Sequence, residues 1–544
     1  MWKSGSKKIG LKHITLAVIF ALVGTQCIAQ NLLERTKQGL SCQSTLEPNR
    51  LSKEVSNTKS ARNVALFTWD NTKSSNPTDE VNLRLSRKQL DKLTLDSNTA
   101  WEVNIPVTAS QGFKVKLIPF KVQSEQGQLL TPEGAIPSTN KMQFYRGIID
   151  GDHGSLVTAS IINGDLQMSI SDQDGIYRIS PSNYKSDNYS IWIDNALTEK
   201  EFTCSTDESH EIERHPEINI TPQKDNNQKA AGDVVQIYVE CDNELRSDKG
   251  GVSGTEAFVA QLFAEIITLY TNEGINMEVS DIFVWTSPDP YAGNQNLGTV
   301  LTQFGANRRN NYNGRIATLL KGDLSSSPFS CGVGGLAWVD VLCNNHNPNS
   351  NSGPYNVNRG IGHCRLNPNP TVSQDALDVS VVAHEIGHNM GSRHTYDCAW
   401  GPSGNQIIDT CPGVNSGCSL VTSPTPTSES GTIMTCGNNL KTFSRGFGTE
   451  PGNLIRSRVA AATCLPSSGS NNNQDPCTHE NRIYAGGFIF STEVIANNNI
   501  TLISDVTVIG NADVEWQAEN QFQVFGTLTI PNGAEVNVIA EDCN

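Results

Sequence analysis

One stretch of the chain carries three histidines and a glutamate at the spacing of a metal-dependent hydrolase. Residues 384–394 read H-E-I-G-H-N-M-G-S-R-H. On a helix, His384 and His388 leave the same face, so both imidazoles can bind one Zn²⁺. Glu385 lies beside them, where its carboxylate can take a proton from a metal-bound water. The stretch therefore predicts a site for one catalytic zinc ion with Glu385 as the general base.

A third histidine, His394, would be carried away from the metal by a straight helix. Gly391 can instead adopt the left-handed conformation that ends a helix and turns the chain back. Three neutral imidazoles, from His384, His388 and His394, then leave one coordination position open, which suits a catalytic site better than a structural one. The alternative is a helix with ordinary surface histidines, and the added glycine and third histidine argue against it.

The elements that must position these residues alternate between strands and helices. Strands are predicted at 234–240, 282–286, 315–320 and 334–343, and helices at 254–270, 297–304 and 375–390. The helix at 254–270 is expected to be amphipathic, with its apolar stripe formed by Phe258, Leu262, Ile266 and Tyr270. Residues 233–466 are thus predicted to form an α/β catalytic domain that contains the zinc helix.

Regions of different composition flank this domain. Within residues 30–232, short strands are predicted at 113–122, 142–149, 155–162 and 166–170, followed by a polar, unpatterned stretch. This region is expected to be a β-rich domain that ends in an exposed linker. Residues 467–476 are Ser/Asn-rich, which is typical of a linker. Residues 477–544 contain evenly spaced β-branched runs and predict a small all-β module, either a sandwich or a stacked solenoid.

The N-terminus has the pattern of a secretory signal. Lysines precede an apolar run from Ile14 to Val23, and small residues at Cys27 and Ala29 predict cleavage after Ala29, which removes residues 1–29. The run is far short of the roughly 20 residues that span a membrane. No second run approaches that length, so we expect a secreted mature chain without a transmembrane segment.

Charge and cysteine content are consistent with export. The formal net charge of −16 argues against nucleic acid as a partner, because no basic field attracts phosphates. Of the 14 cysteines, only Cys27 lies in the predicted signal. The others are too many for a typical cytosolic chain, and since the C-x-x-C spacing is absent we expect mostly disulfides.

The extended histidine motif resembles that of the metzincin zinc metalloproteases. About 40 residues after His394, the stretch around Met434 looks like the Met-turn, whose methionine packs beneath the three histidines. Within the metzincins, the chain is most similar to secreted bacterial members of the reprolysin-like (adamalysin) family. The resemblance implies a twisted mixed sheet with helices, and a zinc metalloendopeptidase that acts on protein or peptide substrates.

The same resemblance implies further features. A segment similar to the strand that this family uses to bind substrate contains Gly335, Leu336, Ala337, Trp338 and Val339. The family commonly links the cysteine that ends this strand to one at the end of the catalytic domain, which implies a Cys343–Cys464 disulfide. Residues 143–155 resemble the family's prodomain, so the chain is expected to be made as a zymogen, a latent precursor.

One departure from the family pattern leaves alternatives open. Thr395 stands where animal and venom reprolysins usually carry Asp, and pappalysin-like metzincins also have Thr there. A pappalysin-like protease is therefore the alternative subfamily. An inactive protease fold that serves in binding or adhesion is the alternative of another class, although every catalytic position is intact. The C-terminal module could contact the cell surface or matrix, and the sequence gives no indication about calcium.

Latency could use a cysteine of the predicted prodomain, which contains Cys42 and Cys204. A thiolate is a good zinc ligand and could take the open position in place of water. Cys204 is the candidate for such a cysteine switch because it lies at the end of the β-rich domain, just before the linker. The alternative is a Cys42–Cys204 disulfide.

Overall fold

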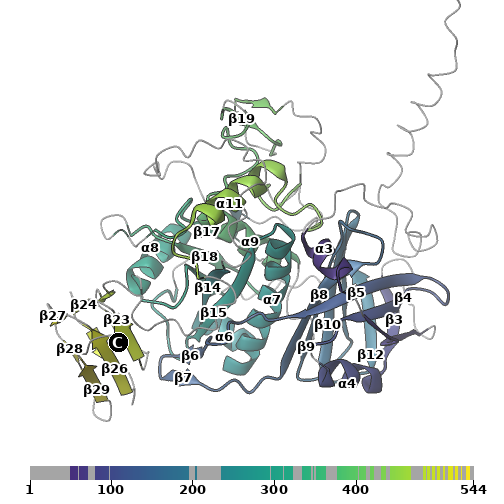
Figure 1. Ribbon diagram of the computed structural model, residues 1–544, viewed down its shortest axis with the longest axis horizontal. Coiled ribbons are helices and arrows are strands. Elements are labelled where there is room, and N and C mark those ends of the chain that lie inside the picture. Colours follow the sequence, from purple (N-terminus) through teal and green to yellow (C-terminus); the bar gives the residue numbers. More distant parts are fainter. Residues whose placement is uncertain are drawn as a thin grey trace, which may run out of the picture.

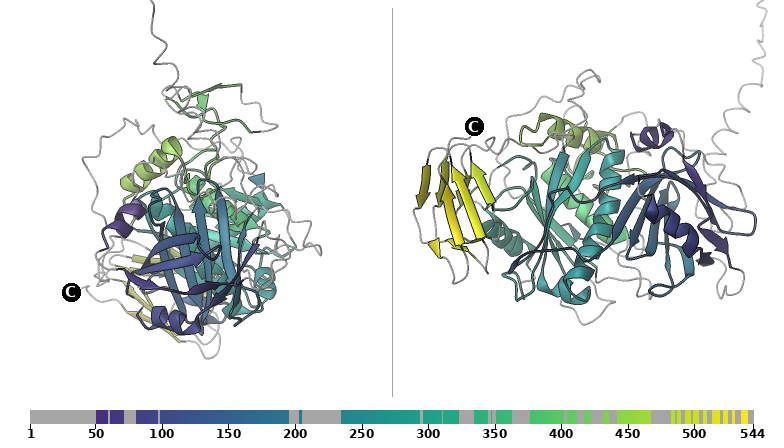
Figure 2. Two further views of the ribbon diagram at one scale, coloured as in Figure 1. Left: turned by 90° about the vertical axis from the view of Figure 1, so that its right-hand side faces the viewer. Right: turned by 60° about the horizontal axis from the view of Figure 1, so that its bottom comes forward.

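The computed structural model describes residues 50–194, 203–204, 234–362, 376–466 and the strands between 482 and 539. Gaps inside these ranges fall at 59–60, 71–79, 97, 294–295, 310, 323–333, 345–346, 348–350, 402–403, 412–416, 422–430 and 436–441. The predicted signal peptide, Cys42 and both predicted linkers lie outside the described residues. Figures 1 and 2 show the arrangement of the parts.

Residues 50–194 form an N-terminal domain built mainly on one large sheet (Figure 1). Along this sheet the strand order is β1-β4-β5-β8-β9-β10-β11-β12-β3-β2 in the described residues. The strands are β1 (Arg62–Val64), β2 (Phe67–Trp69), β3 (Glu80–Leu85), β4 (Trp101–Pro106), β5 (Gly112–Phe120), β8 (Met142–Ile149), β9 (Leu156–Ile162), β10 (Asp165–Asp172), β11 (Gly175–Pro181) and β12 (Asn188–Ile193). Two helices accompany them, α3 (Arg50–Ser56) and α4 (Arg87–Leu95). Alternate burial along β4 and β5 places one face of the sheet on an apolar core of its own.

Residues 234–466 form most of a second, mixed sheet with helices on both faces (Figure 1). Its strand order is β13-β17-β18-β16-β14-β15-β6-β7. The strands are β13 (Thr203–Cys204), β17 (Gly334–Ala337), β18 (Tyr355–Arg359), β16 (Ile316–Lys321), β14 (Val234–Cys241), β15 (Asn276–Val284), β6 (Leu129–Thr131) and β7 (Gly134–Ile136). The helices are α6 (Asn243–Asp248), α7 (Val252–Asn272), α8 (Leu297–Arg308), α9 (Ala376–Asn389) and α11 (Thr449–Ala461). Both edges of this sheet are therefore formed by residues that precede 205.

Alternation along β14 explains why the sheet has two buried faces. Ile237 and Val239 pack into the core that contains α7 and α9, while Tyr238 packs into the core that contains α8. Parallel pairing of β15, β14, β16 and β18 needs such covering on both sides. The mixed α/β fold predicted for this region is confirmed.

Two of the predicted elements differ from the structure. The strand expected at 334–343 ends at Ala337, because the chain then turns through Asp340 and Cys343, whose φ angles are +58° and +65°. The turn brings the backbone N–H of Asp340 to the His388 carbonyl oxygen at 2.9 Å, so it closes the end of α9.

The Cys343–Cys464 disulfide is confirmed, and a second joins Cys398 to Cys418.

The helix predicted to be amphipathic, α7, is buried on nearly all sides. Its apolar stripe faces the sheet as expected, but polar residues such as Gln261 and Glu265 are also buried, with 6% of each exposed. The N-terminal domain covers that second face (Figure 2). Of the described helices, α7 alone is long and apolar enough to cross a membrane, and it is mostly enclosed in the fold.

The described strands after residue 482 pair only in parallel, in three sheets. The first sheet joins β21 (Arg482–Tyr484), β24 (Asn499–Leu502) and β27 (Gln521–Val524), the second β22 (Gly487–Ile489), β25 (Val506–Val508) and β28 (Leu528–Thr529), and the third β23 (Glu493–Ala496), β26 (Asp513–Ala518) and β29 (Glu535–Ile539). Each sheet takes every third strand along the chain. This pairing is the pattern of a stacked solenoid, not of a sandwich.

Candidate active site

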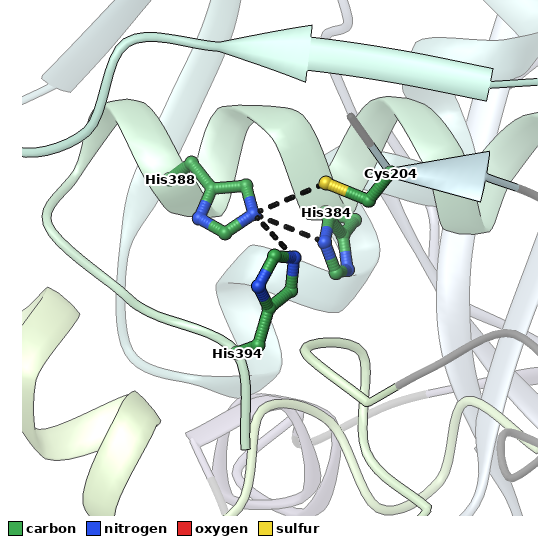
Figure 3. Close-up of side chains that lie close together, drawn as sticks. All are labelled: Cys204, His384, His388 and His394. Carbon is green, nitrogen blue, oxygen red and sulfur yellow. Dashed lines mark hydrogen bonds between the residues drawn. The ribbon is translucent and has the colours of Figure 1, made fainter. Parts of the chain in front are cut away.

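The three predicted histidines meet at one point, together with Cys204 (Figure 3). The Nε2 atom of His388 lies 3.1 Å from Nε2 of His384 and 3.2 Å from Nε2 of His394. The Cys204 Sγ lies 3.5 Å from the same His388 nitrogen. A tetrahedral zinc ion with ordinary bond lengths has nitrogen ligands about 3.3 Å apart and a sulfur ligand slightly further away. The four side chains therefore fit a tetrahedral zinc site.

His384 and His388 each have a hydrogen-bond acceptor at their other ring nitrogen, Nδ1. The acceptors are the Ile433 carbonyl oxygen, 2.7 Å from His384, and the Ser392 carbonyl oxygen, 2.8 Å from His388. Since carbonyl oxygens cannot donate, these two Nδ1 atoms must carry the proton, and their Nε2 lone pairs are left for the metal position. His394 is held differently: its backbone N–H donates to the Asp397 carboxylate at 2.9 Å, and its Nδ1 lies 3.4 Å from the same carboxylate.

Burial keeps the imidazoles of His384 and His388 neutral. His384 is fully buried, and burial, with a smaller effect of His394, lowers its pKa to about 3. The pKa of His388 is lowered well below its usual value by the same two causes in the same order. Neutral imidazole is the form that binds a metal, so the donors fit the expected ion.

The turn after α9 is the one expected from Gly391, whose φ is +98°. The N–H of Gly391 donates to the His388 carbonyl oxygen at 2.9 Å, and the N–H of Ser392 donates to the Gly387 carbonyl oxygen at 3.0 Å. These two bonds are the Schellman motif that ends a helix. The motif reverses the chain so that His394 returns to the other two histidines.

Met434 lies against α9 directly behind the histidines. A Cβ atom added to Gly387 would be 2.8 Å from the Met434 Sδ, so the thioether occupies the space left by that glycine. Met434 is completely buried, and its carbonyl oxygen accepts the N–H of Thr395 at 3.0 Å. Met434 therefore packs against the helix that carries His384 and His388, and the Met-turn stays a prediction.

Asp409 is a residue that the sequence analysis missed. Its carboxylate accepts the Thr395 hydroxyl at 2.5 Å and the Thr435 hydroxyl at 2.6 Å, and it is 4% exposed. It therefore links the residue after His394 to the residue after Met434. Animal and venom reprolysins usually carry Asp at the position of Thr395. In this chain Thr395 is instead hydrogen-bonded to a carboxylate from a different part of the sequence, that of Asp409. No motif or fixed spacing marks Asp409.

Two aromatic residues that sequence reasoning also missed hold His394. The Tyr396 ring stacks on the His394 ring with centroids 4.7 Å apart and planes 8° apart. The Trp400 indole N–H donates to the His394 carbonyl oxygen at 2.7 Å. Both lie within six residues of His394, but no helix or strand period predicts their direction.

Glu385 and the expected substrate strand meet at Gly335. Glu385 is completely buried, and a Cβ at Gly335 would lie 2.3 Å from its Oε1 and 2.4 Å from its Cγ. The carboxylate therefore fills the space beside the strand. Leu336 and Ala337 belong to β17 as expected, whereas Trp338 and Val339 follow its end.

The outer edge of β17 is covered by β13, which pairs in parallel with Cys204 opposite Gly335. This pairing brings Cys204 to the three histidines. Cys204 is outside the disulfides of the described residues. The alternative Cys42–Cys204 pairing involves Cys42, which lies outside the described residues.

Comparisons with known proteins agree with this geometry. Residues 231–444 match the family model Reprolysin_5, described as Metallo-peptidase family M12. These residues are a reprolysin-like metzincin domain. This chain is 23% identical over 279 residues to the zinc metalloproteinase-disintegrin-like BfMP of Bungarus fasciatus. That alignment covers 47% of this chain and 41% of the relative, so the chain spans less than half of the relative's length.

Two solved structures have a low overall similarity to the chain. The crystal structure of metalloproteinase-II from Bacteroides fragilis is 12% identical, with a TM-score of 0.33, and the match covers 56% of this chain and 85% of that one. A chaperone–substrate complex is 10% identical, with a TM-score of 0.23 and coverage of 67% and 57%.

Replacing Gly335 by Ala is expected to displace the Glu385 carboxylate without removing a zinc ligand. A shift of about 1 Å in a reacting group can reduce the rate about 100-fold. Peptide hydrolysis should fall by that order while zinc content stays unchanged. Both quantities are measured after a protease has cut the chain within residues 205–233, which contain the predicted linker. Gly175→Ala is the control, because a Cβ there meets nothing within 4 Å. Full activity of Gly335→Ala would show that the glycine does not constrain Glu385.

Proposed function

We propose that this chain is a secreted zinc-dependent endopeptidase that is made as a latent precursor. The observation that carries the proposal is the convergence of three imidazole nitrogens beside a buried glutamate and the strand β17. The M12 match of residues 231–444 supports the use of zinc and the reaction class. The three histidines would hold one catalytic ion.

The chain's own residues supply the rest of the mechanism. A zinc ion held by the histidines would polarise the scissile carbonyl and lower the pKa of a water molecule. Glu385 accepts the proton of that water and then delivers it to the leaving amine. Glu385 is buried, and its side chain packs against Gly335 where a Cβ atom would otherwise lie. This packing keeps the carboxylate at one position beside the histidines.

Substrate would bind as an added strand on β17. The backbone groups of this strand's outer edge are the ones that β13 uses in the structure. Once β13 leaves, the same N–H and C=O groups can pair with an extended peptide whatever its side chains are. This mode fits protein or peptide substrates, with side-chain preference set by residues around the strand.

Two contacts of Cys204 would make the uncut chain latent. Cys204 presents a thiol 3.5 Å from His388 Nε2, where it can act as the fourth zinc ligand in place of water. The same residue pairs with Gly335 and so covers the substrate strand. Residues 50–204 would then act as the prodomain, and a cut after Cys204 would allow activation.

The match to the reprolysin family model supports that family over the pappalysin-like alternative. The gathering of the three histidines and the burial of Glu385 beside them favour an active protease over the inactive binding protein. Secretion through the signal at 1–29, surface contact through the C-terminal module, and the absence of nucleic acid as a partner stay predictions.

Glu385→Gln should leave zinc bound and the fold intact but remove nearly all hydrolysis, because the glutamate is a base and not a ligand. General-base groups contribute roughly 100- to 10,000-fold. Metal content and chelator-sensitive hydrolysis of a peptide library should be measured together. Glu278→Gln, on β15, is the control. Activity within about tenfold of the parent would contradict the role.

His394→Ala should lower zinc affinity sharply, because the site then has only two histidine anchors. Dialysis against a weak chelator, followed by metal analysis, measures this loss. His153→Ala is the control, since His153 lies in the N-terminal domain and contacts Ser52. Stoichiometric zinc retained by the His394 variant would exclude this histidine as a ligand.

Cys204→Ser should release hydrolysis from the uncut chain if the thiol holds the zinc position. A serine hydroxyl is a much weaker zinc ligand than a thiolate. Initial rates on a short peptide, compared with the uncut parent, measure the release. Cys241→Ala is the control, because this buried cysteine is also outside a disulfide. If the Cys204→Ser chain is as latent as the parent, coverage of β17 alone causes latency.

A further inference from the structure

The N-terminal domain contacts α7 along the whole length of that helix (Figure 2). Buried polar side chains on the second face of α7 are bonded to residues of the N-terminal domain. The pairs are Asn140 with Glu256 at 2.7 Å, Gln167 with Gln261 at 2.6 Å, Arg178 with Glu265, Thr158 with Thr268 at 3.2 Å, and Arg146 with Thr271 at 2.7 Å. The two surfaces are therefore complementary in their hydrogen bonds and not merely in contact.

Arg178 is the centre of this interface. Its guanidinium is 6% exposed and pairs with Asp194 at 2.8 Å and with Glu265 of α7. Asp194 also accepts the N–H of Ala376, the first residue of the zinc helix α9, at 2.9 Å. A carboxylate at a helix N-terminus stabilises the helix. Separation of the domains would leave Glu265 without its arginine and α9 without this carboxylate.

Residues of the N-terminal part also cover the edge of β15 that faces away from β14. The Val279 N–H donates to the Val122 carbonyl oxygen, and the Ser124 N–H donates to the Val279 carbonyl oxygen, both at 2.8 Å. The strand β6 then continues the pairing, with Leu129 opposite Ile282. An exposed edge strand is a site of aggregation, so this cover has a structural value that is independent of latency.

One apolar core, the one that contains α7 and α9, includes residues of both parts. Leu51, Phe144 and Ile148 of the N-terminal domain belong to the same cluster as the residues of α7 and α9. By contrast, the pairs between β13 and β17 in the described residues are those of Thr203 and Cys204. Within the part of the chain that the structure describes, the contacts to β17 are thus few, and the contacts that hold the domains together are extensive.

We infer that residues 50–194 remain bound as a noncovalent subunit of the mature enzyme after the chain is cut between 205 and 233. This inference rests on the proposed latency. The cut frees β13 to leave β17, while the α7 interface and the β15 edge stay closed. The active enzyme is then a two-chain protein whose second subunit is its own N-terminal domain.

The test uses the full chain with a recognition sequence for a site-specific protease inserted between 205 and 233. Glu385→Gln in the same chain prevents self-digestion during sizing. After the cut, both fragments should elute together at the size of the uncut chain, also in high salt and after dilution to nanomolar concentration. Elution as two separate species, with the fragment from 234 onward still folded, would overturn the inference.

Peptide hydrolysis by the cut chain with Glu385 intact separates this inference from the proposed function. Co-elution without hydrolysis would contradict the function and leave the subunit in place. Separate elution with hydrolysis by the fragment from 234 onward would contradict the subunit and leave the function in place. The two readouts are independent, because sizing does not need an active enzyme.

A residue-level test uses Arg178→Ala, which leaves Glu265 and Asp194 buried without the guanidinium. Loss of one partner of a buried charge pair should weaken association of the cut fragments by at least about 30-fold. Arg84→Ala is the matched control, because that side chain is 60% exposed. If Arg178→Ala does not fold, Asn140→Ala removes the part-buried bond to Glu256 and should also raise the dissociation constant. Unchanged association in both variants would overturn the inference.

Discussion

The active site depends on hydrogen bonds at the side of the imidazoles that faces away from the metal position. Carbonyl oxygens of Ile433 and Ser392 accept from Nδ1 of His384 and His388, and the Asp397 carboxylate accepts the backbone N–H of His394. These acceptors come from the segment around Met434, the end of α9 and the loop after it. The ligand geometry therefore exists only when three segments of the chain pack together, and Asp409 connects two of them through Thr395 and Thr435.

Local spacing explains which parts of this site could be predicted from sequence. His384, His388 and Glu385 are on one helix, and the left-handed glycine at 391 fixes the return of His394, so all four follow from positions within eleven residues. Asp409 could not be predicted, because its partners are 14 and 26 residues away and no helix or strand period relates the three positions. The prediction for Met434 depended on family resemblance and not on a period.

Nonlocal pairing explains the larger errors in the fold. The sequence of α7 was interpreted as amphipathic, since its polar residues are typical of a solvated face. They are buried because a separate domain brings Asn140, Gln167 and Arg178 to them. The strands β13 and β6 add to the edges of the catalytic sheet from the N-terminal part of the chain. The sequences of β13 and β6 contain no feature that predicts either pairing.

The contact between Gly335 and Glu385 also limits how such an enzyme can diversify. Since the glutamate occupies the volume where a side chain at 335 would begin, that position must stay glycine for as long as catalysis uses this base. A peptide bound to β17 as proposed would therefore meet bare backbone at Gly335. On that proposal, changes in side-chain preference must arise at positions other than 335, so the evolution of specificity and the preservation of chemistry are assigned to different residues.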